Sequence, residues 1–385
     1  MIKVAVICEF NPFHNGHKLL FERIRAHFAP KAVCIVCIMS GNFVQRGTLA
    51  VMSKYKRAEM AADCGADIVL ELPFPWSASY AQSFARAGVS VAENLGSIDY
   101  LAFGSESSDE DYITDCAEKL SSSEFENELS KSLSDNKNTS RSYAELRSET
   151  FEKMYGRELS RKPNDILALE YISAIKFLKS DIKPLFIKRY KDFSATESRK
   201  YIFSFDNEGL EKCVPDEIFE KTLKAPKFSP NLSDAAGILF LAYADPEKIS
   251  NAPEMSFDLA SRLVNAARSG EFKTLSALFD AVATKKYTDA RIRRAFNFAF
   301  LGVTKEDIAS MPEYTVVLAS SKEGRNALRE FSKSAKINVI ATKSAHNKFS
   351  DLSEKQYRIM EKSDLAYSFQ GEITENEGIK PYIKD

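Results

Sequence analysis

Four short apolar segments alternate with amphipathic segments over the first 105 residues, and this alternation constrains the fold more than any other feature. Strands that are apolar throughout are typical of a parallel sheet covered by helices on both faces. The predicted strands span residues 4–7, 33–39, 67–72 and 100–103, and the predicted helices span 15–28, 54–64 and 79–95. We therefore expect an α/β fold with a Rossmann-like parallel sheet, in which ligands bind at the carboxyl ends of the strands.

The composition is that of an ordinary globular protein. The chain has 385 residues, of which 44% are hydrophobic and 28% charged, with a formal net charge of −1. This balance gives no general sign of nucleic-acid binding, so such a surface would be a local basic patch. No segment approaches the ~18 uninterrupted apolar residues of a membrane span, and the first residues resemble a strand rather than a signal peptide. We expect a cytoplasmic protein that needs no membrane and no stable protein partner.

The six cysteines are scattered, and Cys34 and Cys37 have the spacing of a redox or zinc motif. They fall inside the predicted strand 33–39, where side chains three residues apart point to opposite faces. Buried structural thiols are therefore favoured over a redox or zinc site. Because only four histidines occur and two share one motif, we predict no metal-ligating residues.

Two domains are expected. Residues 1–205 are predicted to form the sheet domain, interrupted by a polar insertion at about 107–162. Residues 206–385 are predicted to be a mainly helical C-terminal domain, with a small βαβ unit near 314–341.

The segment His14-Asn-Gly-His17 lies where the first strand gives way to a helix. The unpaired N–H groups and the positive dipole end of a helix N-terminus favour phosphate binding. Gly16 allows close approach of a nucleotide, and two imidazoles three residues apart can face one ligand. The alternative is one capping histidine and one packed against the sheet. The strand–turn–helix context favours catalytic roles for His14 and His17, with attack at an α-phosphorus and pyrophosphate as leaving group.

A second hydroxyl-rich segment, Ser194-Ala-Thr-Glu-Ser-Arg199, follows a predicted strand at 184–188 and begins a helix. Ser194 and Thr196 could hold the β- and γ-phosphates of ATP. The alternative is a capping box formed by Ser194 and Glu197 and nothing more. Together with the His motif, this segment is typical of adenylyl-transferring α/β nucleotidyltransferases.

Two polar segments are candidate substrate sites. The loop Ser40-Gly-Asn-Phe-Val-Gln-Arg-Gly47 follows the second strand, and a small carboxylate could bind there; the alternative is a turn with a surface arginine. Its candidate residues are Ser40, Asn42, Gln45 and Arg46.

The segment 283–294 combines cations with Tyr287. This combination suits phosphate contact and base stacking, and it suits a solvated helix face equally well. Its candidate residues are Lys285, Lys286, Arg291 and Arg294.

The order of motifs along nearly the whole chain resembles bacterial tRNA(Met) cytidine acetate ligase. The resemblance rests on Glu9-Phe-Asn-Pro-Phe-His-Asn-Gly-His17, Met39-Ser-Gly-Asn-Phe-Val-Gln-Arg-Gly47, Asp67-Ile-Val-Leu-Glu-Leu-Pro73, Phe103-Gly-Ser-Glu106, Pro163-Asn164, Lys188-Arg189 and Lys285-Lys-Tyr-Thr. The loop from Arg189 to Ser194 is shorter than is usual in that family.

The resemblance implies a reaction and an ATP site. The family activates acetate with ATP as acetyl-adenylate, releases pyrophosphate, and acetylates N4 of the wobble cytidine (C34) of elongator tRNA(Met). It also implies a nucleotidyltransferase-type domain followed by a helical domain that helps to hold tRNA. The implied ATP site comprises Ile7, Cys8, Glu9, Phe10, Asn11, Pro12, Phe13, His14, Asn15, Gly16, His17, Lys18, Leu19, Leu20, Gly104, Asn164 and Arg189.

In the expected mechanism, His14 and His17 stabilise charge on the α-phosphate and the leaving group while Mg²⁺ bridges the phosphates. Two alternatives stay open. An adenylyltransferase acting on a small phosphate ester would explain the His motif and the hydroxyl-rich segment. A non-catalytic nucleotide- or RNA-binding protein would use the fold as a scaffold.

Overall fold

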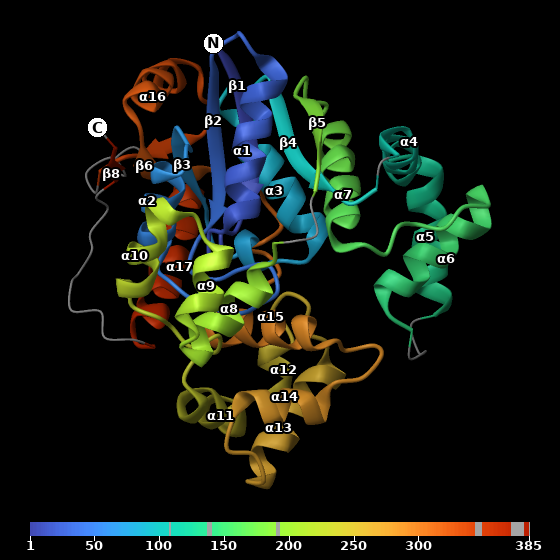
Figure 1. Ribbon diagram of the computed structural model, residues 1–385. Coiled ribbons are helices and arrows are strands. Elements are labelled where there is room, and N and C mark those ends of the chain that lie inside the picture. Colours follow the sequence, from blue (N-terminus) through green and yellow to red (C-terminus); the bar gives the residue numbers. More distant parts are fainter. Residues whose placement is uncertain (108, 137–140, 190–192, 343–348, 371–380, 385) are drawn as a thin grey trace.

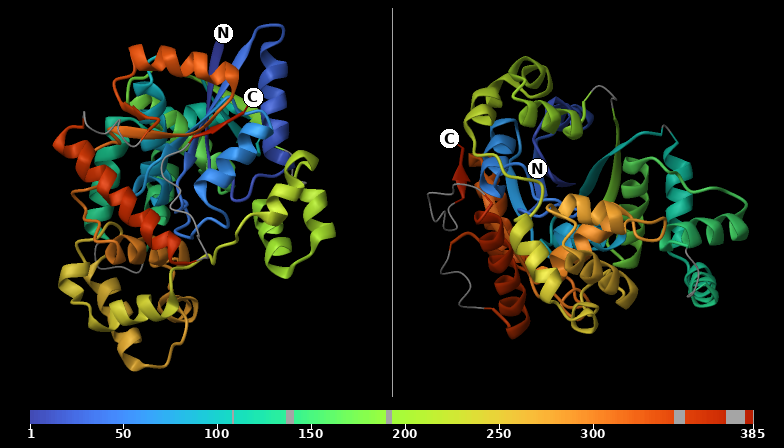
Figure 2. Two further views of the ribbon diagram at one scale, coloured as in Figure 1. Left: turned by 90° about the vertical axis from the view of Figure 1, so that its left-hand side faces the viewer. Right: turned by 90° about the horizontal axis from the view of Figure 1, so that it is seen from below.

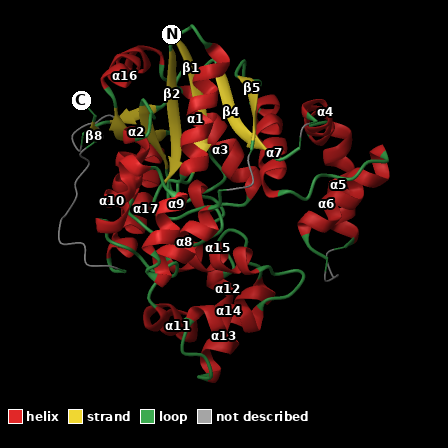
Figure 3. Ribbon diagram, viewed as in Figure 1, coloured by secondary structure: helices red, strands yellow, loops and turns green. Residues whose placement is uncertain are grey.

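The protein folds around one sheet with helices on both faces (Figures 1 and 3). The computed structural model describes all residues except 108, 137–140, 190–192, 343–348, 371–380 and 385. In that part of the chain the strand order is β5-β4-β1-β2-β3-β6-β7, and β8 pairs with β6. The strands are β1 (Ile2–Cys8), β2 (Val33–Ser40), β3 (Ile68–Leu72), β4 (Tyr100–Ser105), β5 (Lys183–Lys188), β6 (Tyr314–Ser320), β7 (Asn338–Ile340) and β8 (Tyr382–Ile383).

The first five strands are parallel, as their continuous apolar sequences predict. All residues of β2 are buried, because helices cover both sides of the strand. Cys34 packs in the core on one face of the sheet, and Cys37 packs in the core on the other. Both are free thiols. The prediction that this pair is structural is confirmed.

Each face of the sheet has its own layer of helices and its own apolar core. One layer contains α3 (Ala81–Asn94), α7 (Pro163–Phe177) and α16 (Lys322–Ser334). The other contains α1 (Asn15–Phe28), α2 (Lys54–Asp63) and α17 (Asp351–Ser368). Short helices α8 (Ala195–Ser204), α9 (Asn207–Cys213) and α10 (Asp216–Lys224) add to the second layer, and α8 and α9 lie near the carboxyl ends of the strands (Figure 1).

The polar insertion contains three helices that stand beside α7 (Figures 1 and 2). They are α4 (Glu110–Leu120), α5 (Ser123–Asp135) and α6 (Tyr143–Tyr155). Although their exposed faces are charged, Ile113 and Cys116 of α4 are fully buried in the core that α3 and α7 share. The insertion is therefore attached to the sheet domain by an apolar contact.

A helical lobe lies beyond the carboxyl ends of the strands (Figure 1). It contains α11 (Asp234–Tyr243), α12 (Pro246–Ile249), α13 (Phe257–Ser269), α14 (Leu275–Val282) and α15 (Asp289–Phe300). Its core includes Phe43, Leu49 and Phe74 from loops of the sheet domain. Because those loops are packed into the lobe, the lobe helps to fix the edge of the sheet where ligands are expected.

The predicted βαβ unit near 314–341 is present, but it does not belong to the helical lobe. β6 and β7 are parallel and α16 connects them, as expected. However, β6 pairs antiparallel with β3 and so extends the main sheet. Every residue of β6 is buried, and such a strand needs neighbours on both sides. The expected division at 205/206 therefore does not separate the sheet from the helices.

Candidate nucleotide-binding site

The two histidines of the β1–α1 corner are stacked on each other and fixed by the backbone. Their ring centroids are 3.7 Å apart. Nδ1 of His14 accepts the N–H of Gly16 at 3.1 Å, and Nδ1 of His17 accepts the N–H of His14 at 3.2 Å. A Cβ on Gly16 would lie 2.9 Å from His14 Cε1, so this packing needs glycine. Because each Nδ1 is an acceptor, the neutral imidazoles carry their protons on Nε2.

Both imidazoles are held in the neutral form. Burial, together with the nearby charge of Arg189, lowers the pKa of His14 to about 3. Burial, with the adjacent His14 and Arg189, lowers the pKa of His17 well below its ordinary value. The corner therefore presents two Nε2–H donors rather than two cations.

A cavity of about 670 Å³ opens at the carboxyl ends of β1, β4 and β5. The residues expected at the ATP site that line it are Ile7, Cys8, Glu9, Phe10, Asn11, His14, Gly16, His17, Leu19, Leu20, Gly104, Asn164, Arg189, Ser194 and Thr196. Five cationic side chains also line it, namely Arg23, Arg46, Lys188, Arg189 and Arg199. The volume and the positive charge suit a nucleoside triphosphate.

Four residues expected at the ATP site do not line the cavity: Pro12, Phe13, Asn15 and Lys18. Phe13 is fully buried beneath the corner. The amide of Asn15 donates to the carbonyl of Lys212, and Lys18 pairs with Glu217. These two side chains connect α1 to α9 and α10 instead of facing the cavity.

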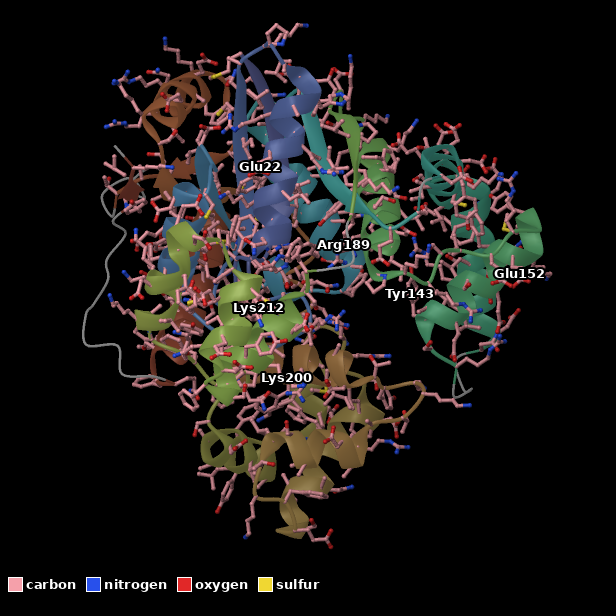
Figure 4. The ribbon with its side chains drawn as sticks, in the orientation of Figure 1. Glu22, Tyr143, Glu152, Arg189, Lys200 and Lys212 are labelled. Carbon is pink, nitrogen blue, oxygen red and sulfur yellow. The ribbon has the colours of Figure 1, made fainter. Side chains whose placement is uncertain are left out.

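Asn164 and Arg189 meet at one end of the cavity through Glu106. A carboxylate oxygen of Glu106 accepts from the side chains of both residues. Arg189 lies at the lower end of β5 (Figure 4). The neighbouring Asp165 accepts the N–H groups of Glu106 and Ser107. Although burial opposes its ionisation, these bonds hold the pKa of Asp165 below its ordinary value.

The expected capping box at the start of α8 is wrong. The Ser194 side chain makes no capping hydrogen bond. Glu197 instead accepts from the Tyr201 hydroxyl, and Thr196 Oγ1 accepts from Arg199. Ser194 and Thr196 both line the cavity, so the hydroxyl-rich segment faces the candidate ligand site.

The loop after β2 is divided between the cavity and the protein interior. Gln45 and Arg46 line the cavity, whereas Ser40 and Asn42 do not. Ser40 is fully buried, and Asn42 donates to Asp364 and accepts the N–H of Lys54. The expectation that Ser40 and Asn42 contact a small carboxylate is therefore wrong: Asn42 holds the loop against α2 and α17, and Ser40 is enclosed with its carbonyl accepting from Arg57 and no hydrogen bond to its Oγ from the described residues.

The basic segment of the helical lobe is used mainly for packing. The Tyr287 ring is buried and its hydroxyl bonds to Ser256, so it is not available for base stacking. Arg294 pairs with Glu254 at 2.6 Å, and Arg291 donates to the Glu254 carbonyl. The expected nucleic-acid contacts by Arg291 and Arg294 are thus replaced by internal bonds. Lys285 remains exposed and Lys286 is half-buried.

Arg57, which the sequence did not single out, fixes the carboxyl ends of β1 and β2. Its guanidinium is fully buried and donates to the carbonyls of Glu9, Ser40, Gly41 and Met52. The sequence feature that could have identified Arg57 is an arginine on the alanine-rich inner face of a predicted helix. Three further cavity residues, Arg23, Tyr171 and Lys188, were not expected there, whereas Arg199, the cation that ends the predicted hydroxyl-rich segment, lines the cavity with Ser194 and Thr196. The middle of the shortened loop, residues 190–192, lies outside the described residues.

Searches of the described residues for two further features were negative. They contain no group of three or more His, Cys, Asp or Glu that could hold a metal ion. They also contain no helix long and apolar enough to cross a membrane.

Comparison with known proteins agrees with this geometry. The HIGH Nucleotidyl Transferase family matches residues 1–379. The tRNA(Met) cytidine acetate ligase of Thermoanaerobacter sp. (strain X514) is 31% identical over 88% of each chain, and that of Lactococcus lactis is 32% identical over 98% of this chain and 97% of its own. The crystal structure of Thermotoga maritima TmcAL bound with alpha-thio ATP superposes over the whole of both chains with a TM-score of 0.89 at 26% identity.

These matches span nearly the complete chain, and they include the corner, the cavity and the helical lobe. The fold, the motif order and the relatives agree. The chain belongs to the tRNA(Met) cytidine acetate ligase family of HIGH nucleotidyl transferases.

Proposed function

We propose that this protein uses ATP to activate acetate as acetyl-adenylate and then acetylates N4 of the wobble cytidine (C34) of elongator tRNA(Met). The observation that carries the proposal is the cavity beside α1, whose described lining includes His14, His17 and five cationic side chains. The names of the relatives supply the acetate and the tRNA.

The triphosphate of ATP would lie at the N-terminus of α1, with His14 and His17 donating to its oxygens. As pyrophosphate leaves, charge grows on those oxygens, and donors that are already oriented stabilise it without reorganisation. Arg189, Ser194 and Thr196 would hold the distal phosphates from the opposite wall. Gly104 leaves room for the nucleoside, because a Cβ there would meet only the Cβ of Arg189, at 3.8 Å.

Magnesium would accompany the nucleotide. Mg²⁺ is usually held by substrate phosphates together with one or two carboxylates and water. Among the described lining residues Glu9 is the only carboxylate. We therefore expect the triphosphate and water to supply most of the ligands, with the charge of Mg²⁺ neutralising part of that of the phosphates.

Acetate would bind near Gln45 and Arg46, where the loop after β2 borders the cavity. Arg46 supplies a permanent cation, and its guanidinium can pair with both oxygens of a carboxylate. The tRNA would approach from the helical lobe, with Lys285 and Lys286 contacting its phosphates. The cytidine would leave its stack to reach the adenylate, since RNA-binding proteins usually read unstacked loop bases. The site of action would be the cytoplasm.

The test is incubation of the purified protein with ATP, labelled acetate and total bacterial tRNA. We expect acetate-dependent exchange of pyrophosphate into ATP, and label in a single elongator tRNA at the wobble cytidine. AMP attached to a small metabolite, without any dependence on acetate, would instead identify an adenylyltransferase. ATP binding without pyrophosphate release would identify a non-catalytic nucleotide-binding protein.

A further inference from the structure

Glu9 is an acidic residue in the wall of a cavity whose other charged side chains, among the described lining residues, are all cations, from Lys and Arg. It lies immediately after β1 and is half-buried. It is the only carboxylate among the described residues that line the cavity. The phosphates of ATP are themselves anionic and do not bind a carboxylate directly, so the place of Glu9 in the wall needs an explanation beyond phosphate binding.

The contacts of Glu9 fix one carboxylate oxygen and the backbone. Oε1 accepts the N–H of Gln45 at 2.8 Å, and the carbonyl accepts from Arg57. The structure shows no hydrogen bond to Oε2 from any described residue. Because Gln45 belongs to the loop where acetate is expected, the carboxylate borders the acyl end of the cavity.

Proton acceptance requires a free lone pair, and the other titratable groups of the cavity offer none near neutral pH. Nδ1 of His14 and Nδ1 of His17 are each occupied by a backbone N–H, and Nε2 of each carries the proton. Burial raises the pKa of the Cys8 thiol and of the Tyr171 phenol, so both remain protonated. Glu9 is the remaining acceptor among the described lining residues.

We infer that Glu9 is the general base of acetyl transfer, an inference that rests on the proposed function. In this step N4 of the cytidine forms a bond to the carbonyl carbon of acetyl-adenylate. The bond between that carbon and the phosphate oxygen breaks, and AMP leaves with the electron pair. The proton lost by N4 goes to the Glu9 carboxylate. Activation of acetate needs no such base, because acetate attacks the α-phosphorus as an anion.

The electrostatics around Glu9 suit this role. Burial raises its pKa, while the N–H of Gln45 and the charges of Arg199, Arg57 and Arg46 act in the opposite direction. A carboxylate with a raised pKa is a stronger proton acceptor than an ordinary glutamate. The three arginines keep the anion in place when the cavity is filled.

The experiment measures the two half-reactions separately in Glu9→Gln. The glutamine keeps an oxygen to accept from Gln45 but cannot take a proton. Because Glu9 also lines the ATP site, we expect some loss of acetate-dependent ATP–pyrophosphate exchange, but a much smaller loss than that of transfer. Single-turnover transfer from preformed acetyl-adenylate to tRNA should fall by roughly 10²–10⁴-fold. Glu9→Asp, which keeps a shorter base, should retain a measurable part of the transfer rate.

The pH dependence of the transfer rate separates the two roles, because a purely structural role of Glu9 would not change it. Wild-type transfer should rise with pH along a limb set by ionisation of Glu9, and Glu9→Gln should lack this limb. Glu22→Gln, an exposed glutamate on α1 (Figure 4), is the matched control and should behave as wild type. The inference is overturned if Glu9→Gln transfers at the wild-type rate, keeps the limb, or loses exchange as severely as transfer. Absence of acetate-dependent exchange in the wild-type protein would instead reject the proposed function.

Discussion

The β1–α1 corner and the basic segment 283–294 both place nitrogen donors and aromatic rings at a helix start, yet the structure uses them differently. At the corner, His14 and His17 bond to the backbone through Nδ1 and present Nε2 to a cavity. In the segment, Arg294 pairs with Glu254 and the Tyr287 ring is buried. In a motif whose side chains are oriented by hydrogen bonds within the same turn, those side chains can still face a ligand. In a run of charged residues without such bonds, the side chains pair with neighbouring parts of the protein.

The largest expected effect is the loss of catalysis when the corner is changed. Replacing both His14 and His17 by Asn keeps a good helix cap but shortens the reach of the donors. We expect acetate-dependent ATP–pyrophosphate exchange to fall by about 10³-fold or more, since a single oriented donor of this kind contributes roughly 10²–10³. Thermal unfolding should confirm that the variant is folded. Undiminished exchange would remove the corner from the mechanism.

The second effect tests whether the basic segment is structural. Arg294→Gln leaves the Glu254 carboxylate without its partner, and the two side chains are only 11% and 12% exposed. Breaking such a pair costs about 3 kcal/mol of unfolding free energy. Chemical denaturation should show this loss, while pyrophosphate exchange at low temperature stays near the wild-type rate. If Arg294→Gln leaves stability unchanged but weakens tRNA binding, Arg294 contacts tRNA instead of stabilising the lobe.

The third prediction concerns pH. The pKa of His14 is about 3 in the folded state and near 6.5 when unfolded. The unfolded chain therefore binds more protons between these values, and stability falls as pH drops below about 6.5, by about 1.4 kcal/mol per pH unit for this group. His17 acts in the same direction. Denaturation at several pH values should show a smaller acid loss in the double Asn variant, and equal slopes would contradict the buried neutral state.

The smallest effect is expected at the exposed end of the basic segment. Replacing Lys285 and Lys286 by Ala should change stability by less than about 0.5 kcal/mol, because neither makes a buried ion pair. If they contact tRNA phosphates, affinity should fall and the slope of log K against log salt should decrease by about one for each lysine. Exchange without tRNA should not change. An unaltered salt slope would exclude this segment from the tRNA surface.

Sequence periodicity predicted the parallel sheet and its covering helices because each strand and helix carries its own apolar pattern. It could not predict that β6 pairs antiparallel with β3, since nothing local in Tyr314–Ser320 specifies its neighbour. The same limit applies to the site. The corner was predictable from consecutive residues, whereas the role of Arg57 depends on how α2 packs against the ends of β1 and β2. Ser40 and Asn42 were assigned by position in a loop, and their burial depends on α2 and α17.

The late position of β6 in the chain has a consequence for synthesis. Until Tyr314–Ser320 leaves the ribosome, β3 is an edge strand with unpaired backbone groups and apolar side chains. Such an edge can pair with another chain and start aggregation. The nascent protein therefore passes most of its translation with an incomplete sheet, and its risk of aggregation depends on how soon the last fifth of the chain is synthesised.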